Sequence, residues 1–406
     1  MHRLIPLTIT LTLGLMLLAC AREATGKEPD AVVRLDYVVA LHPESGSAQI
    51  TLSLTQPERL LKELDFNAPS SRFTGFEGDG KLEVAADRVR WKPPAKGGVI
   101  SYRTQVDSLR GKVYEAKLTP DWALFRLDDL VPPAVTRARA GTRSEATLQL
   151  SDPEDWSFET PYGRGREEVH RVTSDRLFVR PTGWAIAGKI GIRRDTIAGR
   201  EVAIAAPMGE GARRQDMLAF LRWTLPTVVE VFAQFPQNIL LVSGSPDMWR
   251  GGLSGPSSLY LHVDRPLISG NGTSALIHEL VHVAVASLKS ESDDWLVEGL
   301  AEYYSLEVLR RTDGISQERF ESGLEKLEAW AERRGGRLKN PSTGPHTAYA
   351  TLRLHELATQ LEDHGFTLDS VVVELMASGP VSGKRLAQLL EDRGIAGDAF
   401  AAASSR

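Results

Sequence analysis

Two histidines four positions apart, with a glutamate directly after the first, stand in the stretch HELVH at 278–282. On a helix, His278 and His282 project from one face about one turn apart, which is the geometry that a tetrahedral zinc ion needs from two ligands. Glu279 falls beside them, where it could take a proton from a water molecule next to the metal. The pattern therefore predicts a catalytic zinc site.

A third ligand is expected from the next helical segment. A polar break at 290–294 separates the histidines from a helical pattern that begins at Trp295 and carries Glu298 and Glu302. A helix, a short turn and an antiparallel helix would return Glu298 to the histidines and leave the fourth zinc position open for water. Glu302, one turn further on the same face, is expected to accept the free ring N–H of a ligand histidine. The competing interpretation is an exposed helix patch with ordinary histidines, which the apolar surroundings disfavour.

The sequence HELVH followed by WLVEGLAEYYS at 295–305 resembles the gluzincin metallopeptidases. The resemblance is closest to the glycyl aminopeptidase family and its relatives among the membrane alanyl aminopeptidases. It implies a zinc cofactor, a peptide or protein substrate, and a thermolysin-like catalytic domain. It also implies a tyrosine that stabilises the oxyanion of the transition state, for which Tyr349 is the candidate. An ordinary packing role for Tyr349 is the alternative.

A second informative stretch is RGGLSGPSSLYLH at 250–262. Two glycines before a strand let a substrate backbone approach the strand edge and pair with it. In the families it resembles, this place carries a Gly-x-Met-Glu-Asn or Gly-Gly-Leu-Glu-like segment whose glutamate binds the free amino group of the substrate. Gly251, Gly252 and Leu253 fit that segment and are predicted to bind substrate, but Ser254 stands at the glutamate position. Exopeptidase specificity is therefore not implied, and a glycine hairpin turn is the alternative interpretation.

The rest of the chain predicts the elements that must hold this site. Short alternating strands separated by Gly, Pro, Asp and Ser clusters recur up to about residue 205, as in an antiparallel sandwich. From Gly211 the apolar spacing becomes helical, apart from two strand-like segments near 239–242 and 257–263. We expect a multidomain α+β protein. An N-terminal antiparallel β-sandwich-like domain over 31–205 precedes a thermolysin-like (gluzincin) catalytic domain over 206–406 with a small sheet and a helical C-terminal bundle.

The N-terminal twenty residues predict export from the cytoplasm. A basic start precedes an apolar run that ends in Leu-Leu-Ala-Cys, which resembles a bacterial lipobox with Cys20 as the lipidated residue. Cys20 is the only cysteine of the chain, so no internal disulfide can form. We expect a lipoprotein signal peptide over 1–20, a tether over 21–30, and a lipid-anchored protein of the bacterial cell envelope that faces the periplasm from the outer membrane. An uncleaved signal anchor is the alternative.

Charge and composition narrow the possible functions. The net charge of −5 and the pI near 6.0 argue against nucleic acid as a partner. The membrane is expected to be contacted only through the lipid anchor. The sequence thus predicts a zinc-dependent peptidase. A catalytically degenerate peptidase fold that binds peptides or proteins, and a hydrolase of a non-peptide bond, are the two alternatives.

Overall fold

The computed structural model describes residues 31–151, 155–163, 169–174, 176–285, 293–377, 379–397 and 400. The predicted signal peptide, the tether and the lipidation of Cys20 lie outside these described residues. None of the described helices combines the length and the apolar character that crossing a bilayer requires.

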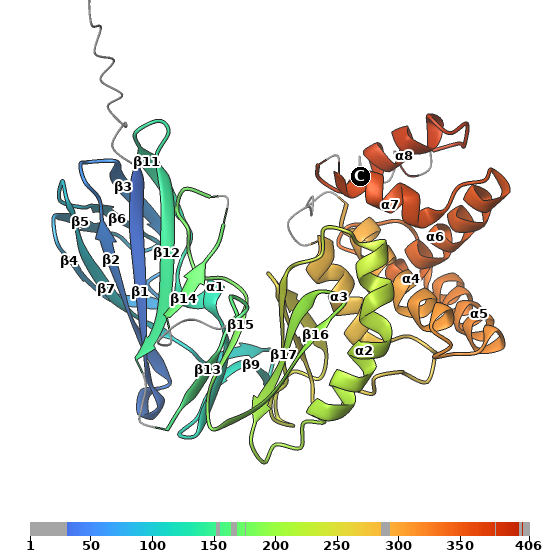
Figure 1. The fold of residues 1–406 in the computed structure, drawn as a ribbon, viewed down its shortest axis with the longest axis horizontal. Helices are drawn as coiled ribbons and strands as arrows, with labels where there is room; N and C mark the ends of the chain where they lie inside the picture. Colours follow the sequence, from blue (N-terminus) through green and yellow to red (C-terminus); the bar gives the residue numbers. More distant parts are fainter. Residues whose placement is uncertain are drawn as a thin grey trace, which may run out of the picture.

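The first half of the chain consists of strands, which lie at the left of Figure 1. A six-stranded sheet has the order β14-β12-β1-β2-β7-β4. Its strands are β1 (Val32–His42), β2 (Ser47–Thr55), β4 (Phe73–Gly78), β7 (Gly97–Gln105), β12 (Arg143–Ser151) and β14 (Val169–Val172). A four-stranded sheet has the order β11-β3-β6-β5. Its strands are β3 (Leu61–Asn67), β5 (Lys81–Val84), β6 (Arg88–Lys92) and β11 (Ala134–Ala138).

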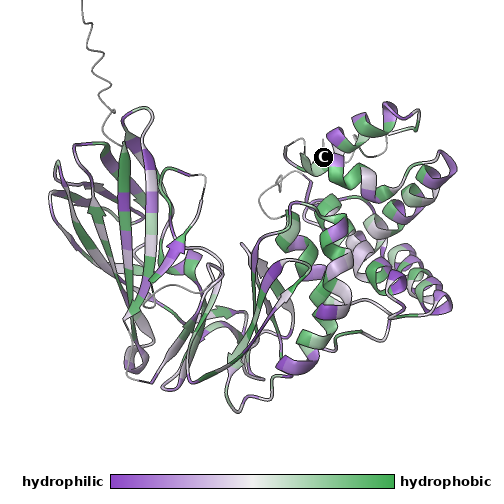
Figure 2. Ribbon diagram, in the orientation of Figure 1, coloured by the Kyte–Doolittle hydropathy of each residue, from purple (hydrophilic) through white to green (hydrophobic). Residues whose placement is uncertain are grey.

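These two sheets share one hydrophobic core. Along β1, buried apolar side chains alternate with more exposed ones, which the hydropathy colours of Figure 2 make visible. Leu35 and Tyr37 from β1 pack in the same cluster as Phe66 and Trp91 from the smaller sheet. The predicted sandwich is therefore present. One pairing differs from the expected antiparallel pattern, because β1 and β12 run parallel.

A third sheet connects this sandwich to the second half of the chain. It has the order β13-β15-β10-β9-β8, with β8 (Ser108–Arg110), β9 (Val113–Leu118), β10 (Trp122–Arg126), β13 (Ser157–Glu159) and β15 (Trp184–Gly188). The short helices η1 (Pro43–Ser45) and α1 (Leu127–Leu130) interrupt the strands. Trp184 from β15 packs against Tyr260 of the next sheet, with 5.4 Å between the ring centroids.

The second half begins with a mixed sheet of order β16-β17-β18-β20-β19. Its strands are β16 (Ile190–Ile197), β17 (Arg200–Pro207), β18 (Asn238–Val242), β19 (Gly252–Gly255) and β20 (Ser258–Leu261). The expected domain boundary at 205/206 falls within β17, which pairs with β18 of this sheet. Alternating hydrophobicity identifies a strand but not the sheet that it joins. The division of the chain into domains stays a prediction.

Helices complete the second half, at the right of Figure 1. They are α2 (Arg214–Val231), α3 (Ala275–Val285), α4 (Asp294–Arg311), α5 (Gln317–Arg334), α6 (Pro345–Asp363), α7 (Leu368–Ala377) and α8 (Gly383–Glu391). Helix α3 contacts β19 and β20 on one side and α4 on the other. A small sheet followed by a helical bundle is the architecture that the sequence predicted.

Candidate metal centre

Helix α3 holds both histidines of the HELVH motif. Ser274 precedes the helix, where its carbonyl accepts the His278 N–H at 2.9 Å and its hydroxyl accepts the Ile277 N–H at 3.4 Å. The apolar side chains of the helix, Leu276, Ile277, Leu280 and Val281 among them, are fully buried. This burial fixes the rotation of α3, so that the two imidazoles share the face turned toward α4.

Glu298 reaches the histidines from α4, as the sequence predicted. The Nε2 atoms of His278 and His282 lie 3.0 Å apart. The carboxylate of Glu298 lies between them, with Oε2 3.6 Å from His278 Nε2 and Oε1 3.4 Å from His282 Nε2. Among the described residues, these three form the one cluster of His, Cys, Asp or Glu side chains that could hold a metal ion.

The donor set fits zinc. Ligand atoms about 2.0–2.1 Å from a tetrahedral zinc ion are roughly 3.3 Å from one another, which is close to the three distances above. Two ring nitrogens that face each other at 3.0 Å can share at most one proton, so this arrangement also suits a cation between them. Two imidazoles and one carboxylate are a borderline-soft set that favours zinc over magnesium or calcium.

Glu302 orients the first histidine. Its Oε2 lies 3.0 Å from His278 Nδ1, on the side of the ring away from His282. Burial lowers the pKa of His278, but hydrogen bonds to Glu298 and Glu302 outweigh it and raise the pKa to about 10. A metal ion at Nε2 requires the neutral ring, so a proton and a metal ion compete for this nitrogen. The contact with Glu302 is the one that the sequence predicted for a carboxylate one turn after Glu298.

Glu279 lies beside the cluster but outside it. Its side chain is 8% exposed, and burial raises the pKa of its carboxyl to about 7, although the charge of His278 and hydrogen bonds from Ser254 lower it. A Cβ atom at Gly252 would be only 2.6 Å from Cγ of Glu279, so the absence of a side chain there leaves room for this glutamate. A buried carboxyl group that titrates near neutral pH is suited to accept and return a proton.

The predicted glycine edge forms a wall of the site. Gly251 and Gly252 line the cavity in front of the cluster, and no described strand pairs with the outer edge of β19. Leu253 turns the other way, into the cluster of side chains that joins the two halves of the chain. Its carbonyl accepts the Trp184 indole N–H at 2.9 Å, and the Ser254 carbonyl accepts an N–H of Arg126 at 3.2 Å.

The cavity has a volume of about 730 Å³ and contains side chains that sequence reasoning did not single out. Trp249 and Trp330 bring aromatic surface to it, and Arg265 is the only lysine or arginine among its described lining residues. A signal for Trp249 was available, because it precedes the glycine pair by only two positions. Trp330 and Arg265 come from segments that no motif connects to the cluster of His278, His282 and Glu298.

Several solved protein structures are similar in fold to this chain. An aminopeptidase N family protein from Idiomarina loihiensis superposes with a TM-score of 0.63 and 17% identity, over 90% of this chain and 72% of that chain. An M1 zinc metallopeptidase from Deinococcus radiodurans gives a TM-score of 0.57 and 15% identity over 92% of both chains. Yeast LTA4 hydrolase gives 0.54 and 14% over 92% of this chain and 66% of that chain.

The chain has the fold of the M1 zinc metallopeptidases. The resemblance drawn from HELVH and WLVEGLAEYYS is confirmed at this level. No protein-family model matches the sequence, and no curated protein does. Placement within the glycyl aminopeptidase family therefore stays a prediction.

Within this M1 fold, Tyr349 does not line the cavity of the metal cluster. It lies in the first turns of α6, where Thr347 and Ala348 reach that cavity, but its own side chain lines a separate cavity of about 250 Å³ between α5 and α6. The oxyanion-stabilising role of Tyr349 therefore stays a prediction. Spacing placed Tyr349 near the start of the helix whose first turn reaches the cavity of the metal cluster, but it could not fix which residues of that helix line the cavity.

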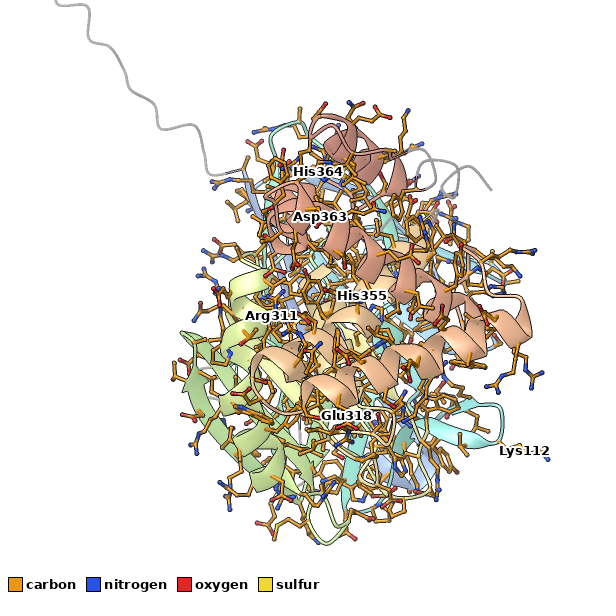
Figure 3. All side chains as sticks on the ribbon, turned by 90° about the vertical axis from the view of Figure 1, so that its right-hand side faces the viewer. Lys112, Arg311, Glu318, His355, Asp363 and His364 are labelled. Atoms are coloured by element: carbon orange, nitrogen blue, oxygen red, sulfur yellow. The ribbon has the colours of Figure 1, made fainter. Side chains whose placement is uncertain are left out.

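The segment HELATQ, which begins at His355, repeats the first half of the HELVH motif but forms no second metal site with the described residues. Thr359 stands where a second histidine would be needed. His355 lies among the helices that face the viewer in Figure 3 and packs against the rings of Phe320 and Tyr303, at 5.8 Å and 6.3 Å between centroids. Burial lowers the pKa of His355, as expected for a neutral packing residue.

Proposed function

We propose that this protein is a zinc-dependent peptidase. The observation that carries the proposal is the meeting of His278, His282 and Glu298 beside the buried Glu279, at a cavity bordered by an open strand edge. A zinc ion held by the first three residues would supply Lewis-acid chemistry. Glu279 accepts the proton of the attacking water and passes it to the leaving amine. Glu302 holds the ring of His278 in place.

The substrate is proposed to bind in an extended conformation along β19. An unpaired strand edge can add a peptide as a further strand through main-chain hydrogen bonds. Gly251 and Gly252 have no side chains to keep the substrate backbone away from Glu279. Trp249 and Trp330 offer apolar surface for substrate side chains.

The described lining of the cavity contains no spare carboxylate for a free substrate amine. Among the described residues that line the cavity, the only acids are Glu279, Glu298 and Glu302, and each already has a place in the metal centre. Asp264 does not line the cavity, and Ser254 stands where related families have glutamate. We therefore propose that the enzyme does not require a free N-terminus and cuts inside peptides.

Hydrolysis of a non-peptide bond is a second candidate. It is favoured by the structural similarity to yeast LTA4 hydrolase, whose name indicates a substrate other than a peptide. The cavity has room for an apolar substrate against Trp249, Leu327 and Trp330. A purely binding role is disfavoured because a binding module has no need of the buried Glu279.

The location is proposed from the sequence alone. We propose that Cys20 is lipidated and anchors the protein in the bacterial cell envelope, facing the periplasm from the outer membrane. Loss of labelled fatty acid from a Cys20→Ser variant would support the anchor, and its retention would contradict it.

Cleavage of matched peptides tests the proposed activity. A chain that begins at Arg22, and so contains every described residue, is incubated with a peptide library in free and N-acetylated forms. We expect internal cuts in both forms, loss of cleavage with a chelator, and loss of roughly 10³-fold or more in Glu279→Gln with zinc retained. Cuts restricted to free N-termini would overturn the endopeptidase proposal. Hydrolysis of esters or epoxides without any peptide cleavage would favour the second candidate.

A further inference from the structure

A second large cavity lies on the four-stranded sheet, in the N-terminal half of the chain. Its volume is about 570 Å³. Five of its lining residues are basic and one is acidic; they are Arg59, Lys62, Lys81, Lys92 and Arg137 with Glu63. The basic residues extend across the whole sheet, from Arg137 on one edge strand, β11, to Lys81 on the other edge strand, β5.

The acids of this sheet face do not balance its cations. Glu63 is 7% exposed, with Lys92 at 3.3 Å and the guanidinium groups of Arg90 and Arg137 each at 3.7 Å. Neither Arg59 nor Lys62 has an ion-pair partner in the part of the chain that the structure describes. Together with Arg59, the four strands β3, β5, β6 and β11 carry seven basic and three acidic residues. The basic residues are Arg59, Lys62, Lys81, Arg88, Arg90, Lys92 and Arg137, and the acidic ones are Glu63, Asp65 and Glu83. This local excess of four positive charges occurs in a chain whose net charge is −5.

The cavity lies at the end of the sandwich where the chain enters it. Strand β1 begins at Val32, paired with Arg143 at the start of β12, and Arg34 pairs with Thr55 at the end of β2. The chain then continues through Arg59 into β3, while Arg139 N donates to Leu60 O at 2.8 Å. Strand β6 ends at Lys92 and β11 ends at Ala138, at the same end. Figure 1 shows this end at the upper left, remote from α3 and α4.

The exposure of these cations favours a broad anionic surface over an enclosed ligand. Arg137 and Lys81 have 77% and 68% of their side chains exposed. Exposed basic residues attract many phosphates at long range rather than fixing one by buried hydrogen bonds. The described fold begins at Ala31 at this end. The preceding residues are the segment that the sequence predicts to carry a lipid anchor, so the choice of a bilayer as the anionic surface rests on the anchor proposed above.

We propose that this cationic end, formed by Arg59, Lys62, Lys81, Lys92 and Arg137, binds the phosphate headgroups of an anionic phospholipid bilayer. The membrane is then contacted by the folded domain as well as through the N-terminal segment. The proposal does not depend on the peptidase activity.

Vesicle binding by the chain that begins at Arg22 tests the proposal without any lipid anchor. The vesicles contain phosphatidylcholine alone, or phosphatidylcholine and phosphatidylglycerol in a ratio of about seven to three. We expect binding to the second kind only, weakened by salt above about 0.1 M. The variant Arg59→Gln, Lys62→Gln, Lys81→Gln, Arg137→Gln should lose at least about tenfold in partitioning. Lys92 is kept because its contact with the buried Glu63, at 3.3 Å, is shorter than that of the more exposed Arg137, at 3.7 Å.

A matched control removes the same charge elsewhere. The variant Lys326→Gln, Arg333→Gln, Arg334→Gln, Lys384→Gln changes exposed residues of α5 and α8 and should bind phosphatidylglycerol vesicles as the wild type does. Unchanged circular dichroism shows that both variants fold. Equal losses in the two variants would mean that net charge alone governs binding and would overturn the proposal. So would absence of vesicle binding by the wild type, or binding to a soluble polyphosphate without binding to vesicles.

Discussion

Because Gly252 has no side chain, the side chain of Glu279 can lie directly against it. The first prediction concerns this contact. A methyl group at Gly252 would meet Cγ of Glu279 at 2.6 Å and its Oε1 at 2.8 Å, so Gly252→Ala must displace the carboxylate. We expect kcat to fall at least about tenfold, because small displacements of a proton acceptor are costly to catalysis. Zinc content should be unchanged, since Glu279 is outside the ligand cluster. Steady-state kinetics and metal analysis on the same preparation measure both.

The control for this change is Gly270→Ala. Nothing lies within 4 Å of a Cβ atom at Gly270, and the residue is exposed. Its activity should equal that of the wild type. A Gly252→Ala variant with full activity would show that Glu279 is not constrained by β19.

Tyr349 gives a second prediction at the same scale. Because its ring lines the cavity between α5 and α6, Tyr349→Phe should change kcat by less than about threefold. A hydroxyl group that stabilised the oxyanion would instead cost about 10²–10³-fold on removal. A loss of that size, measured with zinc retained, would restore the role expected from the sequence and would require α6 to rotate during catalysis.

At the scale of elements, the crossing of α4 and α6 depends on a glycine next to a metal ligand. Gly299 follows Glu298, and a Cβ atom there would lie 2.9 Å from Cβ of Ala350 and 3.0 Å from Cδ1 of Leu354. Alanine gains about 0.5–1 kcal/mol of helix propensity over glycine, but overpacking costs about 1–3 kcal/mol. We expect Gly299→Ala to lower the free energy of unfolding by about 1–2 kcal/mol.

A double-mutant cycle isolates this contact. Ala350→Gly alone should destabilise the protein by about 1 kcal/mol through helix propensity. In the Gly299→Ala background it should relieve the clash, so the two changes together should cost less than the sum of their separate effects. Strict additivity in denaturant unfolding would show that the two helices are not packed as described.

The same elements show what could be predicted from sequence. Helices α3 and α4 were predictable because their apolar spacing is regular, and the candidate ligands His278, His282 and Glu298 were predictable with them because their residue types and spacing suit a metal ion. The glycine edge was predictable in Gly251 and Gly252 but not in Leu253, because strand alternation turns the third residue away. Trp330 and Arg265 could not be predicted, because their approach to the site depends on how α5 and the segment after β20 pack.

At the scale of the whole molecule, the first half of the chain supports the site of the second. Arg126 of β10 donates to the carbonyl of Ser254 on β19 across the junction between sheets. Arg126→Gln removes this contact, worth about 1 kcal/mol, and should raise KM about fivefold with zinc content unchanged. Arg72→Gln is the control, because it removes a similar bond to the Asp129 carbonyl that does not touch β19. Equal KM values in the two variants would contradict a supporting role for the first half.

Domain-scale features were the least accessible to sequence reasoning. Alternating strands predicted the β-rich first half, but they did not reveal that β16 and β17 join the mixed sheet of the second half or that β1 pairs parallel with β12. The basic residues of the cationic end are spread from Arg59 to Arg137 in sequence and gather only when four strands assemble. From the sequence alone, basic residues scattered in this way are interpreted as ordinary solvated surface, because their proximity becomes visible only in the assembled sheet.

The most direct test of the central claim is the zinc content of the purified chain. After equilibration with zinc and removal of the excess, we expect about one zinc ion per wild-type chain and less than about one tenth in His282→Ala and Glu298→Gln. His364→Gln, which changes an exposed histidine just beyond α6 (Figure 3), should bind zinc as the wild type does. A wild-type chain without stoichiometric zinc, or ligand variants that keep it, would contradict the assignment of His278, His282 and Glu298 as the metal centre.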